Sequence, residues 1–247
     1  MEFDALTIAL AACMFAAALL YSSVGHAGAS AYIALMALFG IDAAVMRPTA
    51  LALNIIVASL ASFRFVKAGL FSWRTLWPFL VTALPMAYLG GTIHLPSEVY
   101  RPVVGIVLWL SAARLLWPRP LRAERESSEP PIYFALPAGA AIGLLAGLTG
   151  TGGGIFLSPL LLFMAWAPTR TTSGVAAVFV LANSLSGLAG QWSTLGSLPA
   201  ELPLFAVAAL AGGLIGTTLG IRLPQRAILK LLGIVLLVAG AKLVGVY

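Results

Sequence analysis

The stretch Gly147–Gly154 reads GLTGTGGG, and it separates two apolar segments, Ile132–Leu148 and Ile155–Trp166. Glycine destabilises helix interiors and adopts backbone conformations that other residues avoid. The sequence therefore predicts that one helix ends here and that a shorter one begins. At about 1.5 Å per helical residue, the second segment reaches about half of a membrane, so we expect a half-helix rather than a complete span.

The composition places this interrupted helix in a membrane. Hydrophobic residues make up 61% of the 247 residues and charged residues 9%, whereas soluble domains usually have about 25% charged residues. Mean hydropathy is +1.02. A membrane-spanning helix needs about 20 apolar residues, and barrel strands are shorter and alternate in polarity. Eight continuous apolar segments come near the helical length: Ala5–Leu20, Leu51–Val66, Leu76–Ile93, Val103–Leu116, Ile132–Leu148, Gly174–Ala189, Leu202–Ile221 and Ala227–Val246.

The chain divides into two similar halves around one polar linker. Residues 118–131 combine prolines with mixed charges and predict a loop in water, so we expect transmembrane repeats over residues 1–117 and 132–247. Ile93–Leu116 aligns with Ile221–Val244 at a shift of 128, and Gly25 and Gly28 align with Gly150 and Gly153 at a shift of 125. Each repeat is predicted to hold one glycine-broken helix pair with a short half-helix, followed by three long transmembrane helices.

The distribution of basic residues predicts that the two repeats are inverted. The loop after the third segment holds Arg64, Lys67 and Arg74, whereas its counterpart, Gln191–Glu201, holds no basic residue. Lys and Arg mark the cytoplasmic side. With a cytoplasmic linker and both termini outside, eleven of the fourteen basic residues lie inside. We therefore expect an all-α polytopic membrane protein with two inverted repeats, an architecture that places a transported substrate near the midplane. Glu2 and Asp4 precede the first segment without any basic residue, which favours a retained helix over a cleaved signal peptide.

The two glycine-rich breaks form the predicted binding site. The first N–H groups of a helix are free and carry partial positive charge, and glycine lets a ligand approach the backbone. Such breaks favour an anion. Hydroxyl, imidazole and amide side chains near the breaks could add donors. The predicted site comprises Gly25, His26, Gly28, Ser30, Thr149, Gly150, Thr151, Gly152, Gly153, Gly154 and Asn183.

Structural interpretations compete with these assignments. Glycines are common where membrane helices pack closely. A neutral His26 that donates to a backbone carbonyl is favoured over a titrating one that carries protons. Asn54 is interpreted as a helix bridge, whereas for Asn183 bridging and anion binding stay equally open. Arg47 and Arg170 could attract an anion, but we interpret both as loop arginines that reach into water. The tryptophans near span ends are interpreted as an aromatic belt.

Missing motifs narrow the function further. Every carboxylate falls at the end of a predicted span or outside one, which disfavours a sodium or metal site. The sequence has no P-loop, GxGxxG, HExxH or CxxC motif, and Cys13 is its only cysteine. We therefore expect neither cofactor nor enzymatic activity. The net charge of +6 follows from membrane orientation and predicts no nucleic-acid partner.

The repeated pattern resembles the TauE/SafE sulfite exporter family. The resemblance rests on Gly25–Gly28 with Arg47-Pro48-Thr49, and on Gly147–Gly154 with Arg170-Thr171-Thr172-Ser173. It implies a permease in the cell (inner) membrane that moves sulfite, a sulfonate or a similar sulfur anion without ATP. A passive anion channel remains the alternative. Proton coupling, the direction of transport and homo-oligomer formation stay open.

Overall fold

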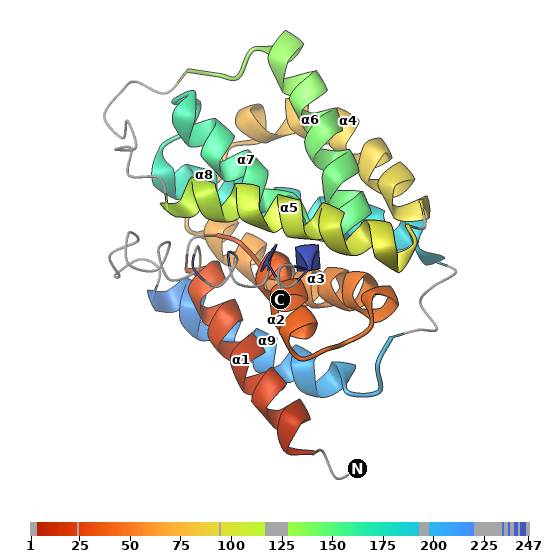
Figure 1. Ribbon diagram of the computed structural model, residues 1–247. Coiled ribbons are helices and arrows are strands. Elements are labelled where there is room, and N and C mark those ends of the chain that lie inside the picture. Colours follow the sequence, from red (N-terminus) through yellow and green to blue (C-terminus); the bar gives the residue numbers. More distant parts are fainter. Residues whose placement is uncertain are drawn as a thin grey trace.

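The computed structural model describes residues 4–23, 25–93, 95–116, 128–192 and 198–219, together with residues 234, 237, 240, 241 and 243–245. The predicted last span and the aligned segment Ile221–Val244 therefore lie almost entirely outside the described residues. Within the described ranges all regular structure is helical, and five helices (α1, α3, α6, α8 and α9) are long and apolar enough to cross a membrane. The helices are α1 (Ala5–Ser22), α2 (Ala29–Leu38), α3 (Ala43–Lys67), α4 (Trp73–Thr92), α5 (Ser97–Leu116), α6 (Ile132–Thr149), α7 (Gly154–Phe163), α8 (Thr169–Gly190) and α9 (Leu202–Leu219) (Figure 1).

Helices α1–α4 and α6–α9 follow the same order of long, short, long and long elements. The short helices α2 and α7 both have 10 residues and begin 125 positions apart. A left-handed glycine caps each N-terminus, Gly28 with φ 113° and Gly153 with φ 80°. Glycine is the residue that adopts this conformation without steric cost. The predicted helix breaks and short helices are thus confirmed in both halves.

The fourth helix of each half packs against the first helix of the other half. α4 packs mainly against α6, and α9 packs mainly against α1. The resulting bundles are α4, α6, α7 and α8, in the upper part of Figure 1, and α1, α2, α3 and α9, in the lower part. Small residues allow the backbones to approach closely: Gly139, Gly143 and Gly147 of α6 meet Phe79, Ala83 and Ala87 of α4, and Gly212 and Gly216 of α9 meet Phe15 and Leu19 of α1.

Helices α3 and α8 join the two bundles at the centre of the molecule. They run antiparallel, because Leu51 lies near Gly187 and Phe65 lies near Gly174 at the other end. Between these contacts Asn54 meets Ser184. This crossing brings polar side chains from both long central helices to the level of the helix breaks.

Three sequence interpretations are wrong. Arg170 is exposed, but it lies in the first turn of α8 rather than in a loop. Arg47 is not a loop residue: α3 begins at Ala43, where the Asp42 carboxylate accepts from the Ala44 amide at 2.8 Å, and Arg47 is only 6% exposed. Pro48 lies inside this helix rather than before it. Trp166 does not belong to an aromatic belt, because it is 8% exposed and its ring packs against the rings of Phe79 and Phe134.

Candidate functional site

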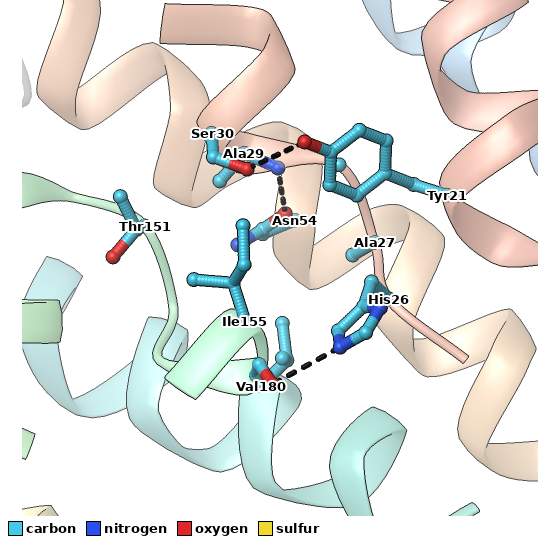
Figure 2. A pocket seen from close by; sticks show the side chains of 11 residues that line it. Tyr21, His26, Ala27, Ala29, Ser30, Asn54, Thr151, Ile155 and Val180 are labelled. Atoms are coloured by element: carbon cyan, nitrogen blue, oxygen red, sulfur yellow. Dashed lines mark hydrogen bonds between the residues drawn. The ribbon is translucent and has the colours of Figure 1, made fainter. Parts of the chain in front are cut away.

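The two helix breaks lie on opposite sides of one small pocket (Figure 2). It has room for about one water molecule. Lining residues come from both breaks, from both short helices and from the central helices α3 and α8. They are Tyr21, His26, Ala27, Gly28, Ala29, Ser30, Asn54, Thr151, Gly154, Ile155 and Val180.

The first break turns the chain from α1 into α2. Gly25 (φ 80°) and Gly28 (φ 113°) both have left-handed backbones, and a side chain on Gly25 would collide with the backbone of Ser173. The Tyr32 hydroxyl donates to the Ala27 carbonyl at 2.7 Å and so braces the turn. At the start of α2, the Ser30 hydroxyl donates to the Tyr21 hydroxyl at 3.0 Å.

The second break turns the chain from α6 into α7 and contains three left-handed glycines, Gly150, Gly152 and Gly153. The Thr149 and Thr151 hydroxyl oxygens are 2.9 Å apart. Among the described residues, no acceptor is found for the amides of Thr151, Gly152 and Gly153. Successive amides in such turns form concave surfaces that bind anions. The second break therefore offers unused donors beside the pocket.

Asn54 connects α3 with both neighbouring elements. Its Oδ1 accepts from the amide of Ala29, the first residue of α2, at 3.0 Å, and its Nδ2 donates to the Ser184 hydroxyl at 3.2 Å. Asn54 is fully buried. It acts as a helix bridge, as the sequence suggested, and at the same time forms one wall of the pocket.

His26 connects the first break with the second short helix. Its Nε2 lies 3.0 Å from the Gly154 carbonyl oxygen and 2.9 Å from the Ser158 hydroxyl. A carbonyl oxygen only accepts hydrogen bonds, so this contact requires a proton on Nε2. The arrangement matches the structural interpretation of His26 as a donor to a backbone carbonyl.

The predicted site residues fall into two groups. His26, Gly28, Ser30, Thr151 and Gly154 line the pocket. The remaining six do not line it, although Gly152 adjoins Asn54 of the pocket wall. Gly25 adjoins Ser173, Gly150 adjoins Arg47, Gly152 adjoins Asn54 and Ser184, Gly153 adjoins Ile142 and Phe179, Thr149 donates to the Leu145 carbonyl, and Asn183 donates to the Phe179 carbonyl.

The predicted site did not include Tyr21, Ala27, Ala29, Asn54, Ile155 or Val180, which also line the pocket. Ile155 and Val180 belong to continuous apolar segments and carry no sequence signal of their own. Tyr21 ends the first apolar segment, where a tyrosine usually indicates the membrane interface. Tyr21 lies four residues before Gly25, and this closeness to the first helix break could have indicated that it lines the site. No carboxylate lines the pocket, and the described part of the chain has no cluster of three or more His, Cys, Asp or Glu that could hold a metal ion.

Comparison with known proteins gives two matches. The family model described as sulfite exporter TauE/SafE matches residues 10–243. A protein from Sinorhizobium fredii (strain NBRC 101917 / NGR234) described as "Probable membrane transporter protein y4hK" is 41% identical over 248 aligned residues, which cover 97% of this chain and 99% of that protein. No solved structure matches the chain.

Proposed function

The chain belongs to the TauE/SafE sulfite exporter family of membrane transporters, and on this premise we propose that it is a secondary transporter of a small sulfur anion such as sulfite or a sulfonate. The anion binds near the membrane midplane, in the pocket between the two helix breaks. Its gradient, alone or with a coupled ion, drives transport, and no ATP is consumed.

One observation supports this proposal: backbone amides of the second break without a protein acceptor lie beside a pocket whose lining contains no carboxylate. The amides of Thr151, Gly152 and Gly153 have no acceptor among the described residues, and the hydroxyls of Thr151 and Ser30 lie in or beside the pocket. Sulfite and sulfonates present three oxygens that only accept when ionised. The N-termini of α2 and α7 add partial positive charge without a fixed cation.

Helix directions support an inverted relation between the halves. Arg47 near the start of α3 donates to carbonyls at the end of α4, whereas Arg64 near the end of α3 donates to groups at the end of α9. The equivalent helices α4 and α9 therefore run in opposite directions along α3. Since α4 runs parallel to α6 and α9 parallel to α1, α1 and α6 are also antiparallel, as are α3 and α8.

The small pocket volume supports a mechanism of alternating access. A space for about one water molecule is too narrow for an anion with three oxygens, so we expect the side chains or helices around the pocket to move when the anion binds. Single hydrogen bonds cross between the two bundles here, from Asn54 to Ser184 and from His26 to Gly154. Each is worth about 1 kcal/mol, so these two hydrogen bonds do not by themselves prevent a rocking motion.

Counterflow in proteoliposomes tests the proposal. Vesicles that contain purified protein and unlabelled sulfite are diluted into trace radiolabelled sulfite. A carrier concentrates the label transiently, and the initial rate saturates with sulfite concentration. Flux that rises linearly and shows no counterflow would indicate a passive anion channel. Protein that neither binds nor moves sulfite, methanesulfonate or thiosulfate would contradict a sulfur-anion substrate.

A further inference from the structure

Arg47 is a buried arginine within a membrane-spanning helix. Its side chain leaves α3 and reaches the C-terminal end of α4, where Nη1 donates to the Ile93 carbonyl at 2.9 Å and Nη2 donates to the carbonyls of Gly90 and Gly91. The residue is 6% exposed. Its Nε–H is also buried and has no acceptor among the described residues.

The positive charge of Arg47 has no carboxylate partner in the described part of the chain. The ion pair found there joins Arg74 to Glu129, both at the exposed surface. Carbonyls at the end of α4 carry only partial negative charge. A charge buried in a membrane protein without a counter-charge is costly and usually functional. Capping the end of α4 therefore does not by itself explain why an arginine is buried at this position.

Arg47 adjoins the second helix break. A Cβ atom on Gly150 would lie 3.0 Å from Arg47 Cγ, so the absence of a side chain at Gly150 gives the arginine its space. The Tyr100 hydroxyl donates to the Thr149 carbonyl beside it at 3.0 Å. On α3, Arg47 and Asn54 are seven residues, or about 10 Å, apart on the same face. Arg47 thus lies about two helical turns from the pocket, at the level of the C-terminal end of α4.

We propose that Arg47 is an oxyanion-docking residue on the transport path. The anion contacts it on the way between the pocket and the membrane side on which α4 ends. This inference rests on the proposed transport of an anion. The guanidinium group suits the role because its planar donors match the oxygens of sulfite and sulfonates. The free Nε–H supplies the first hydrogen bond, and the arriving anion supplies the missing counter-charge. As it docks, it competes with the α4 carbonyls for the Nη donors.

Thermal stabilisation by sulfite and by methanesulfonate measures docking at Arg47. For Arg47→Gln we expect the concentration that gives half-maximal stabilisation to rise about 10- to 100-fold, the range for losing a charge-assisted hydrogen bond. Arg64→Gln is the matched control, because Arg64 lies on the same helix and donates to the Leu214 carbonyl and to the Thr217 and Thr218 hydroxyls. Its half-maximal concentration should equal that of the wild type.

The outcomes separate docking from helix capping. If Arg47 only caps α4, Arg47→Gln lowers the melting temperature without anion and leaves the half-maximal concentration unchanged, which overturns the inference but not the proposed transport. Wild-type protein that no sulfur anion stabilises overturns both. If Arg47→Gln does not fold, Arg47→Lys carries the test, because lysine keeps the charge but lacks the planar fork. We then expect a rise of about 10-fold, and an unchanged value overturns the inference.

Discussion

The Nε2 atom of His26 lies 3.0 Å from the backbone carbonyl oxygen of Gly154. These residues are 128 positions apart, and their contact ties the first helix break to the first residue of α7. Together with the hydrogen bond from Asn54 to Ser184, it holds the two breaks around the pocket. The candidate site is therefore made by both halves of the chain, and neither half forms it alone.

Replacing His26 tests whether it is a neutral donor or a proton carrier. Glutamine at this position can still donate to the Gly154 carbonyl, whereas alanine removes this hydrogen bond between the two halves and the imidazole that packs there. We expect His26→Gln to transport sulfite with the pH dependence of the wild type. His26→Ala should lower the free energy of unfolding by about 1–3 kcal/mol. Sulfite counterflow measured between pH 5 and 8 checks this, and a pH dependence that disappears in His26→Gln would indicate proton coupling through His26.

Gly152→Ala should impair transport more than backbone strain alone explains. A Cβ atom on Gly152 would lie 2.5 Å from Asn54 Nδ2 and 3.0 Å from Ser184 Oγ, so it would push apart the contact between α3 and α8. Gly40→Ala is the matched control. Gly40 has a similar φ, 77° against 72°, and no atom lies within 4 Å of its Cβ position. Both variants carry about 1–2 kcal/mol of left-handed strain.

The measurement for this pair is the initial rate of sulfite counterflow per folded protein, with melting temperatures recorded in parallel. We expect both variants to lose melting temperature from the shared strain, Gly152→Ala the more because of its steric overlap, and a loss of transport confined to Gly152→Ala. Equal transport rates in the two variants would show that the second break does not take part in transport.

The repeated architecture could be predicted from the sequence because glycine has a strong local effect. Four glycines among the five residues Gly150–Gly154 end one helix and start another. Gly25 and Gly28 do the same in the first half with fewer glycines. Apolar length then separates the half-helices from the full spans. These signals are local, so they need no knowledge of tertiary packing.

The partners of each helix could not be predicted in the same way. Nothing in the sequence of α4 indicates that it packs against α6 rather than against its own repeat, because its small residues fit either surface. Arg47 was misplaced because the continuous apolar segment begins only at Leu51, whereas Asp42 caps the helix two turns earlier. Its burial depends on the end of α4, which local patterns do not place.

Asn54→Asp should weaken anion binding while it preserves the fold. The aspartate can still accept from the Ala29 amide, but it places a negative charge in the pocket wall. Like charges brought together cost several kcal/mol, so we expect the dissociation constant for sulfite to rise at least ~10-fold. Ser184→Ala is the control, because it removes the same hydrogen bond to Asn54 without adding charge. Calorimetric titration compares them, and equal affinities would place the anion away from Asn54.

Membrane orientation can be tested with single cysteines in a Cys13→Ser background. The Arg74 guanidinium lies 3.2 Å from the Glu129 carboxylate, so residues near these two positions must share one side. We expect cysteines at Ser72 and Glu129 to react with a membrane-impermeant maleimide only from the cytoplasmic face. A cysteine at Gly40, which precedes the N-terminus of α3, should react only from outside. Labelling of all three from one face would contradict the proposed topology.

Locating a bound anion in the protein shows whether the pocket between the two helix breaks is the transport site. Selenite is the selenium analogue of sulfite, and selenium gives an anomalous X-ray signal that identifies its position in crystals of the protein. We predict an anomalous peak between the N-termini of α2 and α7, within hydrogen-bonding distance of the amides of Thr151–Gly153. A peak only at the protein surface, with these amides bonded to protein groups instead, would contradict it.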